Sequence, residues 1–304
     1  MSPSRDPRLV ASVVVPTYRR PALLRECIEA VLAQLEEGDE LVVCDDGSGD
    51  DTLEVLESVG DERLRWVTQP NAGPAGARNT AVAACRNELL VFVDDDEPPL
   101  PGWLRAHRSA HDPDRRMMVM GRRELLVPHR GGHKVIAASL PSLDGLIPNQ
   151  GSFSLRRAVL SEVAPFREEL RRAEEMELFF RLRAAGVEFV PAPDAVTRHS
   201  IDRSFEEFYA DRLNNGKGSA TLRHLHGIGL YPPVASMRRV DRVLTRAALS
   251  SESAGRLIAR VLWGGVRVAG WIGSWQLQAR LAGRISVMLG ASAEQRALQG
   301  RSAS

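Results

Sequence analysis

Residues 89–97 read Leu-Leu-Val-Phe-Val-Asp-Asp-Asp-Glu, five apolar residues followed directly by four acids. A short run of branched and aromatic residues is long enough for a buried strand and too short for a helix. Three similar Val-containing runs lie at residues 10–15, 41–44 and 64–68. The sequence therefore predicts four buried strands, one of which ends in a cluster of carboxylates.

Helical patterns separate most of these runs. Residues 21–35 and 52–59 carry apolar side chains three and four positions apart, as one face of a helix does. A third helix is expected to begin at Pro74 and to run through residues 75–85, because proline suits the first helical position. Strands that alternate with helices predict a parallel sheet with right-handed crossovers. The fold class is therefore α/β with a Rossmann-like, mostly parallel sheet flanked by helices.

The rest of the chain is less regular. We expect a loop-rich stretch at residues 127–148, interpreted as a lid, and a basic surface loop at residues 214–219. The other expected elements are a strand at residues 117–120 and helices at residues 103–110, 155–163, 173–185 and 205–212, with Gly186 as a carboxy-terminal cap.

Composition and charge bound the class of protein. The chain has 304 residues, of which 43% are apolar and 26% charged, as in an ordinary globular protein. From Met237 onward eleven arginines face three acids, a net charge of +8, which leaves −7 for the preceding part. We expect a catalytic domain at residues 1–230, with halves at 9–110 and 111–230, and a basic helical extension at 231–304. The acidic body argues against a nucleic-acid partner.

The cysteines and the hydropathy pattern indicate a location. Cys27, Cys44 and Cys85 lack CxxC spacing, so we expect neither a disulfide framework nor a zinc site. The amino terminus is short and polar, and the apolar stretch at residues 257–275 is interrupted by two arginines. We therefore expect no signal peptide and no membrane-spanning helix. The expected location is the cytoplasm, and the alternative is a peripheral position at the inner face of the membrane.

Two acidic clusters directly follow predicted strands. Asp45 and Asp46 follow the second strand, and Asp94, Asp95 and Asp96 follow the fourth. In open α/β sheets the ligand crevice lies beyond the carboxyl ends of the strands, so both clusters should converge there. Clustered carboxylates favour a hard cation, and Mg²⁺ or Mn²⁺ with a phosphorylated ligand fits. The alternative for residues 45–48 is a simple strand-to-helix turn.

Four motifs in order resemble family 2 glycosyltransferases of the GT-A fold. They are Val-Val-Val-Pro-Thr-Tyr-Arg-Arg at 13–20, Asp-Asp-Gly-Ser at 45–48, Asn-Ala-Gly-Pro-Ala-Gly-Ala-Arg-Asn at 71–79 and Phe-Val-Asp-Asp-Asp at 92–96. The resemblance is strong over residues 9–110 and looser to about residue 200. It implies a nucleoside diphosphate sugar as donor, with UDP or dTDP as the nucleotide, and Mn²⁺ or Mg²⁺ as cofactor.

The resemblance also implies where the base of the donor binds. Pro16, Thr17 and Tyr18, which follow the first strand, would line the base pocket. Asp46 would accept a hydrogen bond from a ring N–H of the base, with Asp45 beside it.

The remaining donor contacts are implied on the far side of the crevice. Arg78 would lie near the nucleotide, where a guanidinium suits phosphate geometry. Asp94 or Asp95 would touch the ribose, and Asp96 would ligate the metal. His199 occupies a place where the family often has a histidine near the metal or diphosphate. The alternatives are a surface arginine at 78 and a structural hydrogen-bonding histidine at 199.

One carboxylate must take the proton of the acceptor. Residues 172–178 occupy the position where the family usually shows Glu-Asp, the Asp being the base, and Glu175 stands in that place here. Glutamate is one methylene longer, so the backbone or the acceptor must sit back by about a bond length. We expect apolar neighbours to raise the pKa of Glu175. The alternative is that Glu174, Glu175 and Glu177 only complement the helix dipole, with Glu177 pairing Arg181.

The basic tail allows two interpretations. Trp271 and several Leu, Ile and Val residues lie among arginines, as in a helix at an anionic membrane surface, which would suit a lipid-linked acceptor. The alternative, which Gly264, Gly265 and Gly270 favour because glycine weakens a long helix, is a pair of helices packed on the catalytic domain or on a second subunit.

The sequence as a whole predicts a metal-dependent glycosyltransferase that moves a sugar to a hydroxyl or amine of a glycan, lipid-linked or small-molecule acceptor. Inversion at the anomeric carbon rests on the resemblance alone. Two other classes stay open: a non-catalytic nucleotide-sugar binding or scaffold protein, and a sugar nucleotidyltransferase, although the glycine-rich basic loop expected of the latter is absent after the first strand.

Overall fold

The computed structural model describes residues 9–129, 132–137, 151–200 and 204–302. The chain separates into two compact units. The sheet unit comprises Met1–Leu126 and Val135–Ser200, and the helical unit comprises Val127–Lys134 and Ile201–Ser304.

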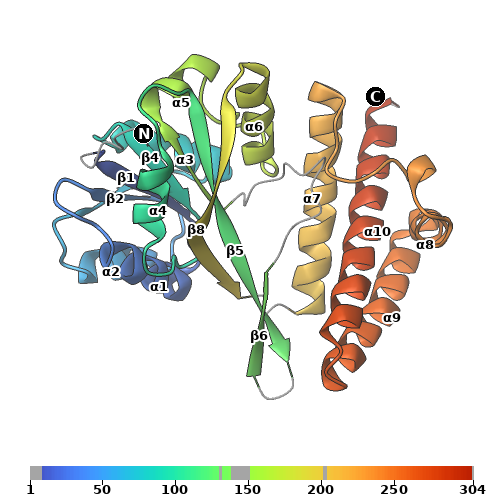
Figure 1. The fold of residues 1–304 in the computed structure, drawn as a ribbon. Helices are drawn as coiled ribbons and strands as arrows, with labels where there is room; N and C mark the ends of the chain where they lie inside the picture. The colour runs from blue at the N-terminus through green and yellow to red at the C-terminus, as the bar shows by residue number, and fades with distance from the viewer. Residues whose placement is uncertain (1–8, 130–131, 138–150, 201–203, 303–304) are drawn as a thin grey trace, which may run out of the picture. The chain divides into compact units, whose positions relative to one another are not determined.

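The strands form one mixed sheet in the order β3-β2-β1-β4-β7-β5-β6, with β8 paired to β5 (Figure 1). Pairing is parallel for β1 with β2 and β4, for β2 with β3 and for β5 with β8, and antiparallel for β7 with β4 and β5. The expected parallel α/β core is therefore confirmed. Their bounds are β1 Ala11–Thr17, β2 Glu40–Asp45, β3 Leu64–Thr68, β4 Leu89–Val93, β5 Met117–His129, β6 Gly132–Ala137, β7 Ser152–Arg156 and β8 Glu188–Ser200.

Helices cover both faces of the sheet (Figure 1). On one face Leu24 and Ile28 of α1 and Trp103 of α4 pack with the apolar strand residues in one buried core. On the other face Phe92 stacks on Phe153 with ring centroids 4.6 Å apart. The helices of this unit are α1 Pro21–Leu32, α2 Thr52–Ser58, α3 Gly73–Ala84, α4 Trp103–Ala110, α5 Arg157–Val163 and α6 Glu174–Ala184.

The helical unit contains four long helices and a short 3₁₀ turn, η1, within the described residues. The long helix α10 packs against α7, α8 and α9. Ser204 begins α7 with a capping box, in which its hydroxyl accepts from the backbone of Glu207. None of the helices in the described ranges is both long and apolar enough to cross a membrane. The bounds are α7 Phe205–His226, η1 Val234–Ser236, α8 Arg239–Ser250, α9 Glu252–Trp271 and α10 Trp275–Ser302.

Two expected loops differ from the structure. The expected surface loop at residues 214–219 is wrong, because α7 continues through it and Gly216 allows α7 to pack closely against Ala293 of α10. The expected domain boundary at residue 230 placed α7 with the catalytic domain, whereas α7 packs within the helical unit. The expected loop at 127–148 is strand at Val127–His129 of β5 and in β6. Residues 130–131 and 138–148 of that stretch lie outside the described part.

Two other expectations are also corrected. The expected helix at residues 155–163 begins two residues later, because Leu155 and Arg156 complete β7 and pair with β4. The glycines of the tail do not interrupt α9, which runs continuously to Trp271. Gly265 instead faces Leu281 of α10, where a Cβ would lie 3.1 Å from a Leu281 methyl group.

A buried polar network joins α4 and the residue that follows it to β7. His107 of α4 shares hydrogen bonds with the hydroxyls of Ser154 and Ser152, at 2.9 Å and 3.1 Å, and His111 with that of Ser154 at 2.8 Å. Burial lowers the pKa of His107 to about 3 and that of His111 to about 4. These histidines are therefore neutral partners of β7 in the core.

Candidate active site

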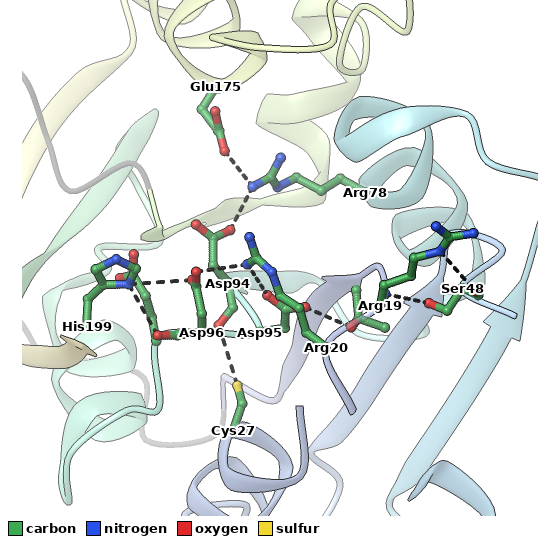
Figure 2. A network of polar contacts seen from close by, with 12 residues as sticks. Arg19, Arg20, Cys27, Ser48, Arg78, Asp94, Asp95, Asp96, Glu175 and His199 are labelled. Atoms are coloured by element: carbon green, nitrogen blue, oxygen red, sulfur yellow. Dashed lines mark hydrogen bonds and ion pairs between the residues drawn. The ribbon is translucent and has the colours of Figure 1, made fainter. Parts of the chain in front are cut away.

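The ends of β1 and β4 meet through Asp95. Thr17, the last residue of β1, donates from its hydroxyl to Asp95 Oδ2 at 2.8 Å. Arg20, which precedes α1, donates from Nη1 to Asp95 Oδ1 at 3.0 Å and to Asp96 Oδ2 at 2.8 Å (Figure 2). Burial raises the pKa of Asp95 to about 6, against the opposing charge of Arg20. Neither Arg20 nor its pairing was predicted.

The next strand end carries Asp45 and Asp46. Asp45 accepts from the backbone N–H of Ser48 at 3.1 Å, so the expected turn is present. Asp46 is buried, and its carboxylate accepts from the N–H groups of Ala72 and Gly73 at 2.8 Å each and from Gln69 Nε2 at 2.7 Å. It therefore satisfies unpaired donors where α3 begins.

The residues at the end of β1 and before α1 differ in how far they are exposed to solvent. Pro16 is half-buried and Tyr18 is exposed. Arg19 has a φ of 55° and donates from its backbone N–H to Ser48 Oγ at 2.9 Å. Its guanidinium lies 5.0 Å from the centre of the Tyr18 ring. Of the expected base-pocket residues, Thr17 is thus held inside the site and Tyr18 lies at its surface.

Arg78 of α3 forms the centre of a second ion cluster. Its guanidinium lies 2.7 Å from Asp94 Oδ1, 2.6 Å from Glu174 Oε1 and 2.5 Å from Glu175 Oε1. The side chain of Arg78 is only 4% exposed, so the alternative of a surface arginine is wrong. Figure 2 shows Arg78 between Glu175 of α6 and Asp94 at the end of β4. The cluster joins residues 96 positions apart in the chain.

The electrostatics of this cluster single out Glu175. Three carboxylates surround one guanidinium, so the cluster carries an excess of negative charge. Burial raises the pKa of Glu175 to about 8, opposed by Arg78 and reinforced by Glu174 and Asp94. The expectation of a raised pKa is confirmed, with desolvation as its cause. A carboxyl group poised near neutral pH can exchange a proton with a ligand.

Glu174 and Glu177 have other partners. Glu174 contacts Arg78 alongside Glu175 and was not assigned that contact from the sequence. Glu177 pairs with Arg181 at 2.8 Å, as the alternative expected, and also with Arg167 at 2.9 Å. Glu177 is therefore part of the support of α6.

Asp96, Glu97 and His199 bring ligand atoms within 4.8 Å of one another. His199 Nδ1 lies 3.6 Å from Asp96 Oδ1. Burial opposes protonation of His199, but the hydrogen bond and charge of Asp96 raise its pKa overall. A carboxylate and an imidazole suit Mn²⁺, which would replace the proton that this pair attracts. Asp96 and His199 therefore fit a divalent cation.

Glu97 has a different environment from the other two. It is fully buried, accepts from the hydroxyl of Thr197 at 2.9 Å and pairs with Arg123. Gly151 approaches it so closely that a Cβ at that position would overlap its carboxylate. Because its oxygens already have partners, Glu97 serves to join β4, β5 and β8 beneath the candidate metal site.

The comparisons with known proteins concern the amino-terminal part of the sequence and the fold. The model of the family described as Glycosyl transferase family 2 matches residues 12–128. The chain is 35% identical over 97 residues to the GalNAc(5)-diNAcBac-PP-undecaprenol beta-1,3-glucosyltransferase of Campylobacter jejuni. These 97 residues make up 31% of each protein. It is 26% identical to the pre-mycofactocin glycosyltransferase of Mycobacterium tuberculosis, over 77% of this chain and 52% of that protein.

A solved structure gives the same fold. The mannosyltransferase of Pyrobaculum calidifontis, in complex with GDP-Man and Mn²⁺, has a TM-score of 0.64 and 18% identity, over 98% of this chain and 90% of that one. The chain spans about half or less of the curated relatives it matches. The part of the chain that carries these motifs, residues 12–128, is thus similar to glycosyltransferase family 2.

Proposed function

We propose that the protein is a metal-dependent glycosyltransferase that moves a sugar from a nucleoside diphosphate sugar, with UDP or dTDP as the nucleotide, to an acceptor hydroxyl or amine. The observation that supports this function best is that acidic residues lie on two sides of Arg78. Asp94, Asp95 and Asp96 follow β4 on one side, and the buried Glu175, whose pKa is raised to about 8, lies on the other. Relatives that carry the name glycosyltransferase support the class of reaction.

On the donor side, the groups that bind the donor are already held in position by the fold. Thr17 and Asp46 take the base, and Asp94 or Asp95 takes the ribose. Asp96 and His199 hold Mn²⁺ or Mg²⁺, which when bound supplies positive charge to the diphosphate. Arg20 spans Asp95 and Asp96 and compensates their charge in the free protein.

On the acceptor side, the proposal assigns the proton transfer to Glu175. The acceptor oxygen or nitrogen attacks the anomeric carbon from the face opposite the diphosphate, and the bond between that carbon and the phosphate oxygen breaks. The proton of the acceptor passes to the Glu175 carboxylate, and the nucleoside diphosphate leaves with the bonding electrons. A single displacement inverts the anomeric centre. Arg78 orients Glu175 in this step.

The test is the release of nucleoside diphosphate from UDP-, dTDP- and GDP-sugars with Mn²⁺, Mg²⁺ or EDTA. We expect release from a UDP- or dTDP-sugar, loss of release in EDTA, and a large reduction in Glu175→Gln. Glu169→Gln is the matched control, because Glu169 is 67% exposed and pairs with Arg167 at the long distance of 3.6 Å. Tight donor binding without release, with every acceptor class supplied, would favour a scaffold protein. The anomeric configuration of the product tests inversion.

A further inference from the structure

Large apolar side chains gather on the outside of the helical unit. Among the described residues, all those more than half exposed lie on α8 and α9 or at the residue that follows α9: Val240, Val243, Leu257, Val261, Val268, Trp271 and Ile272. Single exposed apolar residues are ordinary, but a concentrated group marks an interaction surface.

The members on α9, together with Ile272 directly after it, form one stripe. Leu257, Val261, Val268, Trp271 and Ile272 are 57–68% exposed and follow one another at spacings of 4, 7, 3 and 1 residues. At about 100° per residue these positions occupy one side of the helix. The buried residues Ala259 and Val266 lie on the opposite side, against the unit's own core. We call these five exposed residues the outer stripe.

A surface helix ordinarily turns polar residues outward. In α9 the outward side is also apolar, and Gly264 lies in the middle of the outer stripe. Exposure of this stripe to water is unfavourable, so we expect another apolar surface to cover it.

The charges beside the stripe identify that occupant. Arg256, Arg260 and Arg267 form a row along one edge of the outer stripe, at spacings of 4 and 7 residues. The single acid of α9 is Glu252, at the helix start, where it pairs with Arg256 at 2.8 Å. Arg260 also lies 3.6 Å from Glu206 of α7. With both acids counted against the three arginines, the outer side of α9 is apolar and keeps a net positive charge. This combination complements a surface that is apolar beneath and anionic on top.

The neighbouring helix repeats the pattern. Val240 and Val243 of α8 are exposed, and the exposed arginines Arg239 and Arg246 lie within one turn of Val243. The two helices pack against each other.

We propose that the outer stripe of α9 docks on an anionic lipid surface, with α9 lying in the plane of the membrane. The apolar side chains enter the boundary of the acyl chains, and the arginine row contacts lipid phosphates. At 20 residues α9 is about 30 Å long, which gives an extended contact along the surface. Trp271 lies at the end of the stripe, and an indole favours the headgroup level.

A second copy of the chain fits the outer stripe less well. In a two-fold interface the same patch faces itself. Arg256 and Arg260 already pair with Glu252 and with Glu206 of α7, at 2.8 Å and 3.6 Å. A facing copy of α9 would bring a second row of arginines without a further acid from its outer side, so like charges would meet at the interface. Charge complementarity therefore favours lipid.

The test is flotation of the full chain with vesicles of neutral phosphatidylcholine, with and without anionic phosphatidylglycerol. We expect binding to the anionic vesicles that weakens at high salt. Arg256→Gln with Arg260→Gln and Arg267→Gln should weaken it about 100-fold, at about fivefold for each arginine. Val261→Glu with Val268→Glu should weaken it by at least about 100-fold. Leu225→Glu is the control, since Leu225 of α7 is exposed but outside the stripe.

Flotation needs no turnover, so it tests this proposal separately from the proposed function. Circular dichroism and thermal unfolding establish that each variant is folded. Failure of the parent to bind anionic vesicles would overturn the proposal. A stable dimer that Val261→Glu and Val268→Glu dissociate, in a protein that ignores vesicles, would overturn it in favour of a second copy. Equal binding by parent and stripe variants would also overturn it.

Discussion

The pH dependence of turnover should follow the ionisation of Glu175. Burial raises the pKa of this carboxyl to about 8 in the free protein. A general base acts in its ionised form, and kcat/KM reports the free enzyme. About a tenth of the molecules carry an ionised Glu175 at pH 7 and about a hundredth at pH 6. The structure therefore predicts a kcat/KM that rises about tenfold per pH unit up to about pH 8 and then levels.

The assay is nucleoside diphosphate release at subsaturating donor between pH 5.5 and pH 9.5, with the metal at a fixed free concentration. Glu175→Gln should lower kcat/KM by about 10²- to 10⁴-fold and abolish the rise with pH. Glu175→Asp should keep the rise but lose activity, on the order of 100-fold for a carboxylate drawn back by ~1 Å. A profile that is flat above pH 5.5, or a rise that persists in Glu175→Gln, would assign the proton transfer to another group.

Three further predictions concern stability. Arg78→Met should destabilise the sheet unit by about 3–5 kcal/mol in urea unfolding, because it leaves three carboxylates without their shared cation; the exposed Arg183→Met should change it by less than about 0.5 kcal/mol. His107 has a pKa of about 3 when folded and 6.5 as its ordinary value, so the unfolded chain binds the extra proton between these values. Stability should thus rise with pH across that window, and His107→Gln should reduce the slope by about 1.4 kcal/mol per pH unit; an unchanged slope would mean that the buried imidazole does not titrate on unfolding. Gly216→Ala should lower the melting temperature of the helical unit by overpacking against α10, whereas Gly283→Ala, which meets nothing within 4 Å, should raise it.

Local patterns were enough to predict the part of the fold that carries the acidic edge. The run at residues 89–93 is buried on both faces of the sheet, so its continuous hydrophobicity directly reflects its place beside β1. The acids that follow it lie at the expected strand end because parallel strands place their carboxyl ends together. Residues 21–35 likewise gave the helix that covers one face, although α1 ends at Leu32.

Long-range packing decided the elements that were mispredicted. Leu155, Val159 and Leu160 have helical spacing, yet Leu155 pairs with Leu90 of β4 and belongs to a strand. Residues 214–219 have the composition of a loop, but close packing at Gly216 favours a continuous α7. The same holds in the site, since no local pattern pairs Arg78 with Glu174, 96 positions away, rather than with a phosphate.

In the proposed reaction Asp96 holds a divalent cation through which the donor binds. Calorimetric titration of UDP- and dTDP-sugars into the protein, with Mn²⁺ and with EDTA, examines this claim. We predict binding in Mn²⁺ alone, weakened by about 100-fold in Asp96→Ala and unchanged in the exposed Asp114→Ala. Donor binding that is equally tight in EDTA, or an Asp96→Ala variant that binds donor and Mn²⁺ as the parent does, would contradict the claim.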